Sequence, residues 1–149
     1  MPGVIVATIA ILALIHAYRD FVLDPAADGD VLRRFAFVPG RLTATFNMDA
    51  VADYLTSIAR DPGQLAIARY FLEEGGAQYW TPLSYAGLHG DWIHLGVNCL
   101  WLAAFGGPVA LRFGRLRFVV LFAVTAIAGA LFYYFFHRLD FMPMVGASA

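Results

Sequence analysis

The sequence predicts an all-helical protein that crosses a membrane several times, with three transmembrane helices and the start of a fourth. Two observations support this fold class. The chain has 149 residues, is 60% hydrophobic and only 14% charged, whereas soluble domains carry about 25% charged residues. In addition, three stretches carry almost no charge and are long enough to cross a bilayer as helices. The length suits a single domain.

The first two spans lie near residues 2–20 and 92–111. Arg19 and Asp20 cut the first span short, and we expect Arg19 to extend its guanidinium to the membrane surface. A secretory signal peptide is the alternative for this first span. No positive residue precedes it and no convincing small-residue cleavage site follows it, which favours a retained helix.

The third span lies near residues 117–137, and its uncharged part is the clearest transmembrane signal in the chain. The run from Phe118 to Phe136 has 19 residues, which is about 28 Å of helix at 1.5 Å per residue. This length is close to the ~30 Å hydrocarbon core of a bilayer.

The arginines predict the orientation of the chain. Arg112, Arg115 and Arg117 lie in the short link between the second and third spans, and positive residues favour the cytoplasmic side. The N-terminus is then cytoplasmic and residues 24–91 lie outside. All ten basic residues are arginine, a bias associated with GC-rich bacterial genomes, so we expect a multi-pass protein of a bacterial inner (plasma) membrane.

The composition also limits partners and cofactors. The net charge is -1, which excludes a large basic patch and makes nucleic acid an unexpected partner. Cys99 is the single cysteine, so the chain has no intrachain disulfide and no cysteine zinc cluster. The lipid bilayer is the expected partner, and no cofactor is expected.

The outer segment, residues 24–91, contains signals for short helices. Asn47 or Asp49 is a candidate cap for one helix, and Asp61-Pro62 predicts the start of another that ends before Gly75-Gly76. Phe35 to Leu42 has a mixed apolar and turn-forming composition. We expect these amphipathic pieces to lie in the membrane interface or to pack on the helical bundle.

Two polar residues stand out in the second span. His94 and Asn98 are four residues apart and therefore share one helix face. Side-chain donors on an inward face can stabilise a developing negative charge. Alternatively, the pair only joins two helices through hydrogen bonds.

The C-terminal stretch contains a Gly-x-Ser motif, Gly146-Ala147-Ser148. Gly146 has no Cβ where a substrate backbone would approach. If a fourth helix begins here, Ser148 lies at its positive end, which favours a developing anion. The alternative is an ordinary small-residue contact between membrane helices.

A metal site is not expected. His89 and His94 lie about 140° apart if they are on one helix, so they converge only if a loop bends. No third ligand follows at a recognisable spacing. His16 and His137 lie near span ends, where we expect interfacial or packed histidines.

Together these motifs resemble the rhomboid family of intramembrane serine proteases. The segment from His89 to Asn98, HGDWIHLGVN, fits the family signature His-x4-His-x3-Asn, and Gly146-Ala147-Ser148 follows one span later, as the family's Gly-x-Ser motif does. The resemblance implies that Ser148 is the nucleophile. It also implies that His94 and Asn98 form the side-chain part of the oxyanion hole, and that His89 and Gly146 support the site.

By this resemblance, residues 1–149 form a partial rhomboid domain with a rhomboid-like helical bundle. The function implied is a serine endopeptidase that cleaves transmembrane helices of membrane proteins. The family's base histidine lies on a later span that is absent from these 149 residues, so we expect this truncated chain to be inactive by itself. The alternative is a non-catalytic rhomboid-like membrane protein that binds transmembrane segments.

Overall fold

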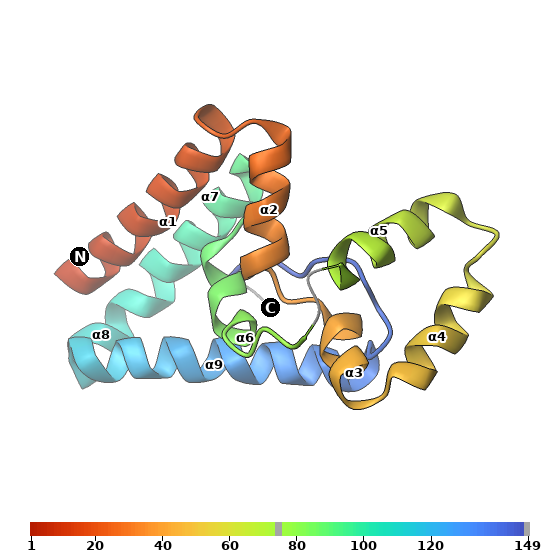
Figure 1. Cartoon of the computed structure of the whole chain (residues 1–149). Helices are drawn as coiled ribbons and strands as arrows, with labels where there is room; N and C mark the ends of the chain where they lie inside the picture. The colour runs from red at the N-terminus through yellow and green to blue at the C-terminus, as the bar shows by residue number, and fades with distance from the viewer. Residues whose placement is uncertain (74–75, 148–149) are drawn as a thin grey trace.

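The structure, a computed structural model, describes residues 1–73 and 76–147, and these residues fold into helices without an extended strand. Figure 1 shows long helical segments with a group of shorter helices to one side. The short helices between the first and second long segments are α2 (Pro25–Phe35), α3 (Pro39–Phe46), α4 (Met48–Ser57), α5 (Pro62–Leu72) and α6 (Thr81–Ser84).

Three helical segments are long and apolar enough to cross a membrane. They are α1 (Gly3–Phe21), the segment Trp92–Phe113 and α9 (Arg115–Phe136). This confirms the predicted all-helical fold class with three transmembrane helices. The predicted start of a fourth helix falls at residues 148–149, which lie outside the described part of the chain.

The second span changes its helical pitch partway along. It consists of α7 (Trp92–Trp101), a π-helical stretch (Leu102–Gly106) and α8 (Gly107–Phe113). Pro108 has no backbone N–H and cannot complete the regular α-helical hydrogen-bond pattern, which is a common cause of such irregularities. The span therefore continues across the membrane without the ideal 3.6-residue register.

Gly106 allows three spans to approach one another. A Cβ on this residue would lie 3.0 Å from Ile5 Cδ1 of α1 and 3.1 Å from Phe118 Cε2 of α9. Ile5, Ala110 and Phe118 form a buried cluster at the same junction. Figure 1 shows the result: α1 runs beside α7, and α8 meets one end of α9.

Caps explain where the outer helices begin. Asn47 accepts a hydrogen bond from the Ala50 N–H at the start of α4, and Asp61 accepts bonds from two N–H groups at the start of α5. Asp61 was predicted as a cap, and Asn47 was one of two candidates, with Asp49 as the other. The helix α2 was not predicted, although Asp24-Pro25 repeats the Asp-Pro pattern that correctly indicated α5.

The segment Phe35 to Leu42, predicted to be turn-forming, is only partly a turn. It joins the end of α2 to α3, and Pro39 is the first residue of α3, where its missing N–H costs no hydrogen bond. Residues 36–40 are all buried. This link therefore belongs to the core rather than to a surface turn.

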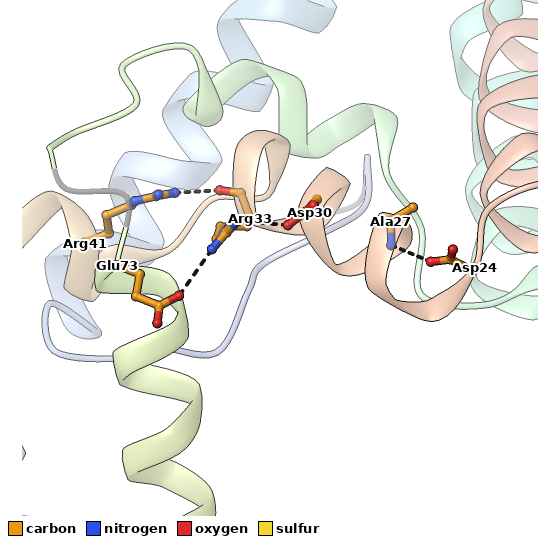
Figure 2. Close-up of polar contacts among 6 residues, drawn as sticks. All are labelled: Asp24, Ala27, Asp30, Arg33, Arg41 and Glu73. Atoms are coloured by element: carbon orange, nitrogen blue, oxygen red, sulfur yellow. Dashed lines mark hydrogen bonds and ion pairs between the residues drawn. The ribbon is translucent and has the colours of Figure 1, made fainter.

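Arginines connect the outer helices, as Figure 2 shows. Arg33 of α2 contacts Asp30 on its own helix at 2.8 Å and Glu73, just after α5, at 3.5 Å. Arg41 of α3 donates a hydrogen bond to the Arg33 carbonyl. These contacts hold α2, α3 and the end of α5 together.

Arg19 is buried against α2 at the end of α1, and its predicted reach to the membrane surface stays a prediction. Its side chain is only 9% exposed and forms a bidentate pair with Asp28 of α2, at 2.7 and 3.1 Å. Its third donor, Nη1, reaches the carbonyl of His89 at 2.9 Å. A buried guanidinium requires such partners, and α2 supplies one that the sequence did not reveal.

The segment after α9 returns to the outer helices. Phe37 and Met144 form an isolated antiparallel bridge, and the Gly40 N–H donates to the Asp140 carbonyl. The Gly146 N–H then donates to the Tyr85 carbonyl at 3.0 Å. These backbone hydrogen bonds place Gly146 against α7.

Candidate functional site

The structure brings Gly146 directly against His94 and Asn98. A Cβ added to Gly146 would lie 2.5 Å from His94 Cε1 and Nε2 and 3.7 Å from Asn98 Nδ2. Gly146 has φ +111°, a backbone conformation that other residues rarely adopt. The two motifs are far apart in sequence, yet their residues meet at one point.

His94 and Asn98 lie on α7 as the sequence predicted, on one face and one turn apart. Asp91 caps this helix, and its Oδ1 accepts a hydrogen bond from the His94 N–H at 2.7 Å. This hydrogen bond holds the pKa of Asp91 below its ordinary value. The cap begins α7 three residues before His94 and so fixes where that residue sits.

Asn98 is buried, and its amide nitrogen, a hydrogen-bond donor, lies near Gly146. Its Nδ2 donates one hydrogen bond to the His94 carbonyl at 3.0 Å. A side-chain amide carries two N–H donors, so a second donor remains for a group near Gly146. The bond to the carbonyl also holds the side chain in one orientation.

Tyr85 is a site residue that the sequence analysis missed. It is 1% exposed, its carbonyl accepts the Gly146 N–H, and its hydroxyl donates to the Ala126 carbonyl on α9 at 2.9 Å. Burial raises the pKa of this phenol, so the hydroxyl stays a donor. Tyr85 thus joins Gly146 to the third span, and no local sequence pattern indicated it.

His89 lies in the loop before α7, and this loop bends so that the two histidines converge. The rings of His89 and His94 are 5.2 Å apart in an edge-to-face arrangement. His89 is fully buried, and its carbonyl accepts the hydrogen bond from Arg19. Burial, followed by the charges of His94, His16 and Arg19, lowers the pKa of His89 to about 4.

This pKa predicts an acid-sensitive fold. The folded-state pKa of about 4 lies below the ordinary value of 6.5, so the unfolded chain binds the proton more tightly. The stability from neutral His89 is fully present above pH 6.5 and is lost as the pH falls from there toward about 4. We expect the melting temperature in detergent to fall across this window, and less steeply in His89→Gln. Equal slopes for the two proteins would contradict the assignment.

The other histidines lie apart from Gly146. His16 is buried on α1, and its ring packs edge-to-face on Trp92 at 4.6 Å. His137 is exposed after α9 and stacks on Tyr133. Within residues 1–73 and 76–147 no group of three or more metal-ligating side chains is present. Ser148 lies outside the described residues, so its predicted position stays a prediction.

An apolar cavity of about 490 Å³ lies next to this site. Asn98 and Ala147 form part of its wall, and Phe118, Leu121 and Thr125 of α9 form another part. A mostly apolar lining with a few polar groups is typical of a ligand site. The cavity therefore offers an apolar binding surface next to Asn98, which suits an apolar polypeptide segment.

The arrangement can stabilise a negative charge close to residue 146. Asn98 Nδ2 and the His94 ring lie beside Gly146, and fixed hydrogen-bond donors stabilise an oxyanion. The same geometry is also compatible with a purely structural contact, because polar side chains join membrane helices.

Comparison with known proteins identified one domain. Residues 76–149 match the family model of the Rhomboid domain. No curated protein and no solved structure matches the chain.

Proposed function

The chain belongs to the rhomboid family through its residues 76–149 and is an integral multi-pass membrane protein, and from this premise we propose that it provides the nucleophile and oxyanion hole of an intramembrane serine endopeptidase. Ser148 is the proposed nucleophile. His94 and Asn98 are the proposed oxyanion donors.

The position of Gly146 is the observation that carries this proposal. Its backbone lies against the His94 ring. A Cβ added to Gly146 would lie 3.7 Å from Asn98 Nδ2. Ser148 follows two residues later in the sequence. Attack by a serine hydroxyl on a peptide carbonyl creates an oxyanion, and donors near the nucleophile stabilise it.

The proposed substrates are transmembrane helices of other membrane proteins. The cavity beside Asn98 is lined mostly by apolar side chains of α7, α8 and α9, which suits a segment from the bilayer better than a soluble peptide. A substrate helix has to unwind locally before its carbonyl reaches the donors, so small residues near the cleaved bond are favoured.

Cleavage by the protein expressed from the whole gene tests this function. The protein and a reporter with one transmembrane helix containing an alanine- and glycine-rich stretch are placed in liposomes, and fragments are identified by mass spectrometry. Cleavage that Ser148→Ala abolishes supports the protease. A reporter that cross-links to the chain but stays intact supports the alternative, a non-catalytic binder of transmembrane segments.

None of the four histidines in residues 1–149 is the proposed base, so these residues by themselves are expected not to react with a fluorophosphonate. The hydroxyl of serine is a weak nucleophile without a base, and the family resemblance places the base on a different span. Mass spectrometry checks for an adduct on Ser148, with the product of the whole gene as positive control. An adduct that Ser148→Ala removes would mean that one of the four histidines acts as the base.

The proposed orientation has a cytoplasmic N-terminus, residues 24–91 outside and the α8–α9 link inside, in a bacterial inner membrane. Single cysteines test it in a Cys99→Ala background. We expect an impermeant maleimide to label Ser57→Cys, on exposed α4, in intact cells. Leu116→Cys, beside Arg115 and Arg117, is expected to react only after the membrane is opened. The reverse pattern would invert the topology.

A further inference from the structure

A second pocket lies beside His16 and Gly90, and we define it as the outer pocket. It has a volume of about 290 Å³, and its wall includes His16 and Arg19 of α1, Asp28 of α2, Gly90 of the loop before α7, and also Asp20 and Leu23. The proposed function does not use this pocket. Its wall carries several charged and polar side chains, although it lies at one end of a membrane-spanning helix.

His16, which lines this pocket, and His89, which precedes Gly90 of its wall, have unused hydrogen-bonding atoms. Neither ring nitrogen of His16, nor of His89, forms a hydrogen bond with any group in the described residues, and all four atoms are buried. The side chains are 5% and 0% exposed. Buried polar atoms are nearly always paired with protein or with ordered water, so these rings need a partner that the described residues do not supply.

The carboxylates of the outer pocket do not provide a cation site. Asp28 is paired with Arg19, Asp20 accepts a hydrogen bond from Trp92 Nε1 at 2.9 Å, and Asp24 caps α2 through the Ala27 N–H. Figure 2 shows the Asp24 cap. Each acidic group already has a donor, so a small neutral molecule that donates and accepts fits better than a metal ion.

We propose that the outer pocket is a water-binding site that hydrates His16 and His89 and supplies water to His94. The volume exceeds the ~30 Å³ that one water occupies in the liquid, so it holds several. Gly90 separates this pocket from His94, and a Cβ on Gly90 would be 4.0 Å from His94 Nδ1.

His94 thus lies between the two regions. The ring edge with Nδ1 faces Gly90, and the edge with Nε2 faces Gly146. A water that accepts a hydrogen bond from one ring nitrogen or donates to it selects the tautomer of the ring. Such a water would hold the His94 ring in position as an oxyanion donor, a consequence that rests on the proposed function. The hydration of His16 and His89 does not depend on the proposed function.

Solid-state NMR of the chain in lipid bilayers tests the proposal directly. The chain has four histidines, so ¹⁵N-histidine labelling gives few signals, which His→Gln variants assign. Magnetisation is transferred from water to the rings. We expect His16 and His89 to receive it within about twofold of the rate for exposed His137. Slow transfer to both buried rings would overturn the proposal.

Leu23→Trp is a more specific test, because the larger tryptophan side chain fills the outer pocket. We expect it to slow transfer to His16 about threefold or more and to leave His137 unchanged. Leu14→Trp is the matched control, since Leu14 is 70% exposed on α1. If Leu23→Trp does not fold, Gly90→Val fills the pocket from the opposite wall. If a folded variant with a filled pocket still transfers magnetisation from water to His16 at the wild-type rate, the proposal that water reaches His16 through this pocket is wrong. A dry pocket in a protein that cleaves would refute this inference alone.

Discussion

Asn98→Ala is expected to lower turnover about a hundredfold or more in the protein expressed from the whole gene, because a lost oxyanion donor typically costs that much in kcat. The Asn98 amide lies next to Gly146 and has a donor beyond the one used on the His94 carbonyl. His94→Ala is expected to have an effect of similar size. The measurement is the cleavage rate of a transmembrane reporter in liposomes, with KM and kcat determined separately.

Thr8→Val is the matched control for this experiment. Thr8 lies on α1 and does not line the cavity, and its hydroxyl donates to the Val4 carbonyl of its own helix at 2.9 Å. We expect its kcat to stay within about twofold of the wild type, since it contributes no donor near Gly146. Full activity in Asn98→Ala would contradict the oxyanion role of Asn98 and leave it a structural role in helix packing.

Gly146→Ala is expected to displace either His94 or the segment after α9, and to destabilise the fold by about 1–3 kcal/mol. The new Cβ would lie 2.5 Å from two atoms of the His94 ring, at φ +111°. A real Cβ does not tolerate such a distance, so one element has to move. The melting temperature in detergent and the ¹⁵N shifts of His94 measure the two effects.

Gly96→Ala provides a control of opposite sign. Gly96 lies on the exposed side of α7, and a Cβ there meets nothing within 4 Å. Glycine inside a helix is less favourable than alanine by roughly 0.5–1 kcal/mol, so this variant is expected to be slightly more stable. A Gly146→Ala protein with wild-type stability and unchanged His94 shifts would refute the close approach.

Much of the fold could be predicted because its signals are local. Uncharged runs indicate membrane spans directly, and Asn47 and Asp61 indicated the helices that they cap. The pitch change at residues 102–106 and the burial of Arg19 depend on neighbouring helices, so periodicity could not reveal them. The partner of Arg19, Asp28, lies on α2, a helix that was not predicted.

The candidate site was predictable only in part for the same reason. Spacing placed His94 and Asn98 on one face, and the family motif linked them to Gly146, which the structure brings into contact with them. The angle between His89 and His94 could not be predicted from a single helix, because a loop carries His89. Tyr85 acts through its carbonyl and through a hydroxyl that reaches α9, contacts without any sequence spacing of their own.

The bridge between Phe37 and Met144 has a consequence for the order of folding. Phe37 lies before the second span and Met144 lies after the third, so the ribosome has to synthesise all three spans before they can meet. Closing this loop costs conformational entropy, and the same returning segment carries Gly146 to the Tyr85 carbonyl. The donor site therefore cannot be completed until the third span has been synthesised.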